Sequence, residues 1–167
     1  MMSIRYLSTD FAVRSALDRA DFAAAARHGF ATVVNFRPDQ EVPGQMTSAE
    51  AQRAAHAVGL AYVHIPTSKY DVFADDLVSE TARILTATAG PVLAYCASGQ
   101  RAAILWAAVI ARSTPVDDVL AALNSAGFDL DFLRDDLEAQ ADRARWAQSS
   151  SDLLPDHSED VRVSAAA

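Results

Sequence analysis

The chain has 167 residues, a hydrophobic content of 51% and a formal net charge of −8 at pH 7. This length suits one domain, and the hydrophobic content is enough to form a core without disulfides or metal ions. The excess of 22 acidic over 14 basic residues argues against nucleic acid and anionic membranes as partners, because both attract concentrated positive charge.

The cysteine content and the apolar runs indicate the compartment. Cys96 is the only cysteine and cannot form an internal disulfide, so nothing indicates an oxidising environment. The N-terminus lacks a signal-peptide pattern, and the longest apolar run, residues 102–111, is too short to span a bilayer. We therefore expect a soluble, cytoplasmic protein. No spacing of Cys, His, Asp and Glu predicts a metal site, and we expect no cofactor.

The first half of the chain alternates predicted helices and strands. A polar start over residues 8–18 precedes an Ala-rich helix over 19–28, which a glycine ends. The β-branched run at 32–36 predicts an inner strand. A helix over 47–59, with Thr or Ser as its N-cap, is followed by a second strand at 61–65.

The second half continues the alternation and becomes more apolar. An amphipathic helix over 74–88 leads to a strand at 91–95, whose apolar composition is typical of a central strand covered on both faces. The helix over 102–112 is apolar all round and therefore buried. Two further helices follow, over 116–126 and 131–146.

Strands separated by helices predict a single-domain α/β fold with a mostly parallel central sheet flanked by helices. We expect the catalytic domain to span residues 1–146. Residues 147–167 are rich in Ser, Asp and Ala, and this composition predicts a disordered acidic tail.

The strand at 91–95 runs directly into a loop that reaches the next helix. Its residues are Cys96, Ala97, Ser98, Gly99, Gln100 and Arg101. Open α/β sheets bind ligands at the carboxyl ends of their strands, where this loop lies. Its backbone N–H groups and the positive end of the helix favour an anion, first of all a thiolate. The guanidinium of Arg101 adds a planar fork of donors for a bound oxyanion.

A lone cysteine is more often an inert core residue than a nucleophile. Here the strand, the glycine-containing turn, Arg101 and the helix together favour function. We therefore predict Cys96 as the nucleophile, Arg101 as its anion-binding partner, and the N–H groups over 97–101 as the substrate cradle.

Several segments in this order resemble the bacterial phosphatase-like domain of β-lactamase-hydrolase-like proteins, a former domain of unknown function that is also labelled a sulfur transferase. They are residues 30–39, 41–45, 48–50, 59–66 and 90–101. The resemblance covers about residues 4–145. It implies a dual-specificity-phosphatase-like fold of the tyrosine-phosphatase superfamily, with Cys96 as nucleophile and Arg101 as anion-binding residue.

Two activities fit this loop, and both use an activated thiolate. In sulfur transfer, Cys96 takes a sulfur atom from a small-molecule donor and passes it to a thiol acceptor. In the alternative, Cys96 attacks a phosphate ester and forms a phosphocysteine. Four residues separate Cys96 from Arg101, as in many rhodaneses, whereas tyrosine-phosphatase loops contain one more. This spacing favours sulfur transfer as the leading hypothesis.

The general acid is the second criterion. A phosphatase needs an acid to protonate the leaving alkoxide, and dual-specificity phosphatases carry an aspartate just after the strand that corresponds to residues 61–65. Here no aspartate follows this strand directly. The first one, Asp71, lies later in the loop and is either a candidate acid or an ordinary solvated loop residue. This also favours sulfur transfer. A non-catalytic redox or anion sensor is the third hypothesis.

Three further polar residues lie near the same sheet edge. Arg37 follows a strand, and it either contacts an anionic substrate or pairs with a neighbouring acid. Asn35 is expected to orient a loop through its amide. His64 is a candidate base for the cysteine, although a hydrogen-bonded core histidine is the simpler interpretation.

Overall fold

A five-stranded sheet runs through the middle of the molecule in the order β1-β2-β5-β3-β4. The computed structural model describes residues 3–152. Only β1 and β2 pair antiparallel; the other neighbours are parallel, which confirms the predicted mostly parallel α/β sheet. The strands are β1 (Arg5–Tyr6), β2 (Phe11–Arg14), β3 (Thr32–Asn35), β4 (Ala61–His64) and β5 (Val92–Tyr95).

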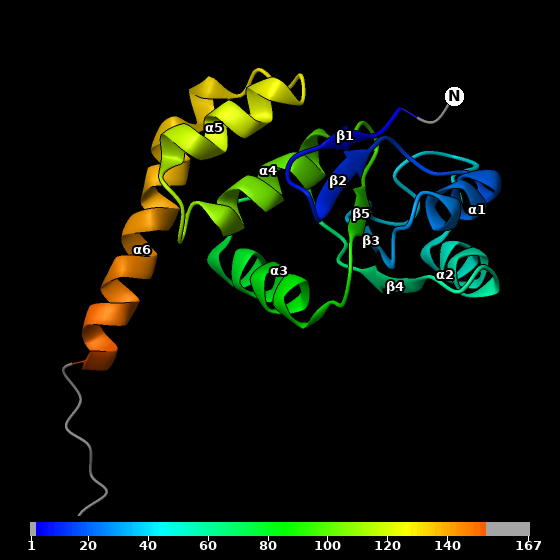
Figure 1. Ribbon diagram of the computed structural model, residues 1–167, viewed down its shortest axis with the longest axis horizontal. Coiled ribbons are helices and arrows are strands. Elements are labelled where there is room, and N and C mark those ends of the chain that lie inside the picture. The colour runs from blue at the N-terminus through cyan, green and yellow to red at the C-terminus, as the bar shows by residue number, and fades with distance from the viewer. Residues whose placement is uncertain (1–2, 153–167) are drawn as a thin grey trace, which may run out of the picture.

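Helices cover both faces of the sheet (Figure 1). One face carries α1 (Arg19–Arg27) and α2 (Ser48–Ala57). The other carries α4, which contacts β2 and β5 directly, and α3, α5 and α6, which pack on α4. These elements are α3 (Asp75–Ala87), α4 (Gln100–Ile110), α5 (Val116–Ser125), the short 3₁₀ helix η1 (Asp131–Leu133) and α6 (Arg134–Asp152).

The central strand β5 contributes to two cores because successive side chains of a strand point to opposite faces. Leu93 and Tyr95 pack with the α1–α2 side, whereas Ala94 and the following Cys96 pack with α4. All four residues of β5 are buried, as the apolar composition predicts. This alternation places the cysteine on the α4 face of the sheet.

The sequence predicted a polar start over residues 8–18 and revealed no strand there. These residues contain β2, whose Ala12 and Val13 are fully buried beside β5. The strand is only four residues long, three of them apolar, and is flanked by Ser and Asp, so it carries little local signal. Its pairing partner lies about eighty residues later, which composition alone does not reveal.

The predicted disordered tail begins too early. Helix α6 continues to Asp152, so residues 147–152 are helical. Within this end, the hydroxyl groups of residues 149–151 donate to the backbone carbonyl groups four residues earlier, which makes serine compatible with a helix. Residues 153–167, the remainder of the predicted tail, lie outside the described residues.

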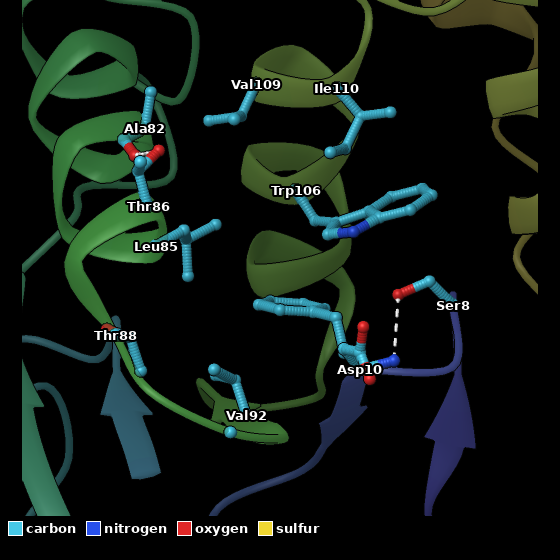
Figure 2. A pocket seen from close by; sticks show the side chains of 12 residues that line it. Ser8, Asp10, Ala82, Leu85, Thr86, Thr88, Val92, Trp106, Val109 and Ile110 are labelled. Carbon is cyan, nitrogen blue, oxygen red and sulfur yellow. Dashed lines mark hydrogen bonds between the residues drawn. The ribbon is translucent and has the colours of Figure 1, made fainter.

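A cavity of about 500 Å³ opens between α3 and α4 (Figure 2). Leu85 of α3 and Trp106 of α4 face it, together with Val92, the first residue of β5. It therefore lies at the amino ends of the parallel strands, at the opposite edge of the sheet from Cys96. Over residues 3–152, no helix is long and apolar enough to cross a membrane.

A buried amide joins three helices on the α4 side. Gln140 of α6 is 1% exposed. Its Oε1 accepts hydrogen bonds from Nε and Nη2 of Arg112 at 3.1 and 2.9 Å, and its Nε2 donates to the Phe73 carbonyl at 3.3 Å. Arg112 also pairs with Asp75 at the start of α3, at 2.8 Å. The amide therefore connects α6 with the ends of α3 and α4.

Replacing Gln140 by Met keeps the side-chain volume but removes the buried oxygen that accepts hydrogen bonds from the Arg112 guanidinium. We expect Gln140→Met to lower the free energy of unfolding by about 1–3 kcal/mol, measured by urea denaturation. Gln148→Met, at an exposed position of the same helix, is the control and should change stability by less than about 0.5 kcal/mol. Equal midpoints for the two variants would show that the amide does not stabilise this packing.

Candidate active site

Cys96 directly follows β5 and its side chain is almost wholly buried, at 1% exposure. The backbone N–H of Gly99 donates to its Sγ at 3.2 Å. Helix α4 begins at Gln100, so the sulfur also lies near the positive end of a helix of 11 residues. Both features stabilise negative charge on the sulfur.

Gly99 allows the chain to turn from Cys96 into α4. It is the N-cap of that helix and has a left-handed backbone conformation, with φ of 91°. A Cβ at this position would lie 3.2 Å from both the carbonyl carbon and the oxygen of Arg14. The N–H of Ala16 also donates to the Ala97 carbonyl at 3.2 Å. The loop therefore packs tightly against the end of β2.

The Arg101 side chain is held by two other loops and is only 10% exposed. Its Nη1 donates to the backbone carbonyl of Thr67 at 2.8 Å, and its Nη2 donates to Oε1 of Glu41 at 2.6 Å. The guanidinium is thus fixed in direction before any ligand binds, which reduces the side-chain entropy lost on binding.

Glu41 connects Arg37, which lies in the loop after β3, with Arg101 in the first turn of α4. Its second oxygen, Oε2, accepts from Nε of Arg37 at 2.8 Å. Burial alone would raise the pKa of Glu41, but hydrogen bonds from Arg37 and Arg101 outweigh it and hold this pKa below its usual value. The carboxylate therefore stays charged at neutral pH.

A cavity of about 200 Å³ opens beside the cysteine. It lies at the carboxyl end of β5. Of the predicted loop residues, Ser98, Gln100 and Arg101 line it with Cys96, whereas Ala97 and Gly99 form the backbone between them. The full lining is Lys69, Val72, Cys96, Ser98, Gln100, Arg101 and Ile104.

The two predicted site residues outside the Cys96–Arg101 loop do not line this cavity either. Arg37 points to Glu41, which is the ion-pair alternative proposed from the sequence. Asp71 is exposed, and its backbone forms the turn before α3 by bonding with Ser68 and Ala74. The neighbouring Val72 lines the cavity instead. The roles of Arg37 in substrate contact and of Asp71 as an acid stay predictions.

Three polar side chains on the α2 side of the sheet hold the Arg37 loop. Asn35 donates to the Tyr62 hydroxyl at 2.9 Å and accepts from the backbone N–H of Arg37 at 2.8 Å, so its amide orients the loop as expected. Nε2 of His64 lies 2.9 Å from the Arg37 carbonyl. His64 is thus a hydrogen-bonded structural residue on the face opposite Cys96. Burial raises the pKa of the Tyr62 hydroxyl.

Sequence reasoning missed two features of the site. It offered a neighbouring acid as a partner of Arg37 but did not pair Glu41 with Arg101, from which Glu41 is separated by 60 positions. It also assigned no role to Lys69, which lines the cavity. The available signal was position, since Lys69 follows β4 in a loop at the carboxyl edge of the sheet, where ligands bind. Over residues 3–152, no three His, Cys, Asp or Glu side chains gather as a metal site requires.

The sequence pattern of one protein family matches residues 3–113 of this chain. That family is described as "Beta-lactamase hydrolase-like protein, phosphatase-like domain". The chain belongs to this family. The resemblance given by the sequence motifs is therefore confirmed, and the match includes all five strands and the whole of α4.

Curated relatives carry the same name and are longer. The chain is 37% identical over 123 residues to a Beta-lactamase hydrolase-like protein of Xylella fastidiosa, a match that covers 72% of this chain. It spans only 28% of the length of that relative. Most of the sequence of that relative therefore lies outside the match.

Solved structures place the fold among phosphatases. A protein of Neisseria meningitidis assigned as a phosphatase is 30% identical, with a TM-score of 0.73 and coverage of 84% of this chain and 99% of that one. TpbA of P. aeruginosa, solved in complex with pTyr, is 21% identical, with a TM-score of 0.60 and coverage of 89% and 91%. These findings confirm the phosphatase-like fold. They favour the phosphatase alternative over sulfur transfer, which they do not support.

The close approach at Gly99 generates a prediction about stability. Gly99→Ala places a Cβ against the Arg14 backbone and also forces an alanine into the left-handed backbone conformation. We therefore expect it to lower the free energy of unfolding by about 2–4 kcal/mol. Gly127→Ala is the matched control, because Gly127 has φ of 81° but open space around a Cβ; it should cost about 1–2 kcal/mol. Urea denaturation of both variants measures the difference. Equal losses would contradict a packing role for Gly99.

The carboxylate of Glu41 generates a prediction about pH. Because its pKa is lowered in the folded chain, its stabilisation is present above the unfolded pKa and is lost as pH falls through the folded pKa. Glu41→Gln should therefore be less stable than the wild type at pH 7 and approach it in acid, measured as thermal midpoints between pH 7 and about pH 3. Glu80→Gln, an exposed change on α3, is the control and should show no such convergence. A pH-independent difference for Glu41→Gln would contradict the assignment.

Proposed function

We propose that the domain hydrolyses phosphate monoesters through a phosphocysteine at Cys96. The observation that carries this proposal is the position of the sulfur. It lies at the carboxyl end of the central strand, accepts the Gly99 N–H at 3.2 Å, and lines one cavity together with Arg101. The family to which the chain belongs is phosphatase-like.

The first step of the proposed reaction is attack of the Cys96 thiolate on phosphorus. The thiolate is favoured by the Gly99 N–H and by the start of α4. The non-bridging oxygens of the phosphoryl group would bind the loop N–H groups over residues 97–101 and the Arg101 guanidinium. Preorganised donors of this kind stabilise the charge that develops in the transition state.

Two hydrogen bonds fix the position of the Arg101 guanidinium, which supports its assignment to oxyanion binding. Thr67 and Glu41 occupy Nη1 and Nη2, so the guanidinium keeps one orientation while a ligand enters. A bound oxyanion would then compete with, or share, the Nη2 donor that Glu41 uses. Arg37 takes part indirectly, because it holds the other oxygen of Glu41.

Sulfur transfer remains a second candidate because of the loop length. Four residues lie between Cys96 and Arg101, a spacing found in many rhodaneses, and a persulfide needs no general acid. TpbA, which shares the fold, was solved with pTyr, and we therefore rank a phosphate ester above a sulfur donor as substrate. A thiol acceptor belongs only to the second candidate.

Steady-state hydrolysis of p-nitrophenyl phosphate tests the proposed function. We expect turnover by the wild type and none above background for Cys96→Ser, because a hydroxyl is a far weaker nucleophile at neutral pH. Arg101→Lys should lower kcat by about 10²–10³-fold, since an ammonium cannot replace the guanidinium fork. Arg53→Lys, at an exposed position of α2, is the control and should retain wild-type rates. Full activity in Cys96→Ser would exclude the phosphocysteine route.

A further inference from the structure

Both charged side chains that line the Cys96 cavity are positive. Lys69 and Arg101 are the charged residues of its lining, and within the described part of the chain no Asp or Glu side chain reaches it. Lys69 is the only lysine in the sequence. Its ammonium lies 5.0 Å from the centre of the Tyr70 ring, and it makes no ion pair with any residue over 3–152. An ammonium group that no described carboxylate neutralises therefore lines the cavity next to the nucleophile.

The two nearby carboxylates are poorly suited to donate a proton. Both oxygens of Glu41 accept hydrogen bonds from arginines, at 2.6 and 2.8 Å, which favours the charged form. Asp71 is exposed and stands outside the cavity lining. Neither carboxylate lines the cavity in which a group would bind against Cys96.

A site without a general acid restricts the leaving group. When the bond between phosphorus and the bridging oxygen breaks, that oxygen takes the electron pair. An alkoxide is too basic to leave readily without a proton, and general acid catalysis normally contributes about 10²–10⁴-fold to such a step. A phenolate or a phosphate is stable as an anion and needs only charge compensation.

We infer that this site selects phosphate compounds whose leaving group departs as an anion, namely aryl phosphates or phosphoanhydrides, with the Lys69 ammonium compensating the charge on the departing oxygen. This inference rests on the proposed function. It extends that function by assigning the class of substrate and a second cationic residue at the site.

The reaction balances without a proton donor. The Cys96 thiolate forms a sulfur–phosphorus bond while the phosphorus–oxygen bond breaks, and the leaving oxygen carries the electron pair away beside Lys69. Water then attacks the phosphocysteine. The sulfur–phosphorus bond breaks, its electron pair returns to sulfur, and the proton of water leaves to the phosphate or to solvent.

The test is a series of substituted phenyl phosphates of similar shape, with O-phosphoserine as the alkyl member and inorganic triphosphate as the anhydride. We expect kcat/KM to fall steeply as the leaving-group pKa rises, triphosphate to be hydrolysed, and O-phosphoserine to be slower than the aryl members by about 10²–10⁴-fold. Lys69→Met should lower kcat/KM by about 10-fold or more and steepen the dependence on leaving-group pKa. Lys69→Arg should retain most of the rate.

Controls separate this inference from the function on which it rests. Arg53→Met removes an exposed positive charge on α2 and should leave the series unchanged. The effect of Lys69→Met should also shrink at high salt, because Lys69 is exposed. A flat dependence on leaving-group pKa, or O-phosphoserine turned over as fast as phenyl phosphate, would overturn the inference alone. No turnover of any member would overturn the proposed function as well.

Discussion

The site depends on how the chain passes from the central strand into a helix. Cys96 directly follows β5 and Gln100 begins α4, so only a very short turn separates them. Gly99 makes this possible through its left-handed backbone, with φ of 91° and no side chain against the backbone of Arg14. The same turn aims an N–H at the sulfur. The turn at Gly99 therefore determines the loop conformation, the burial of the cysteine and the polar group that faces its sulfur.

Arg101 couples this turn to the rest of the sheet edge. It lies one residue into α4 and is fixed by the Thr67 carbonyl, after β4, and by Glu41, after β3. Glu41 in turn holds Arg37. Three loops that are distant in sequence thus meet through one guanidinium, which is possible because the carboxyl ends of parallel strands share an edge. Helices α5 and α6 lie beyond the family match at 3–113 and support this edge indirectly, by packing on α4.

Much of this arrangement could be predicted from the sequence. The apolar run before Cys96, Gly99 within the loop and the apolar helix after Arg101 predicted the strand, turn and helix correctly, because local composition determines them. Long-range pairing was harder to predict. The strand β2 was missed because its short run becomes a strand only beside β5. The contact of Glu41 with Arg101 and the place of Lys69 in the cavity depend on loop paths, which follow from tertiary packing and carry no periodic signal.

The proposed reaction requires that Cys96 carries a phosphoryl group during turnover. The intact mass of the enzyme after rapid acid quenching with p-nitrophenyl phosphate, and in parallel after exposure to thiosulfate, tests this requirement, with Cys96→Ser as control. We expect a gain of one phosphoryl group on the wild type in the first reaction, no gain in the variant, and no sulfur gain in the second. A gain of one sulfur atom from thiosulfate, discharged by cyanide and without any phosphoryl adduct, would contradict it and establish sulfur transfer instead.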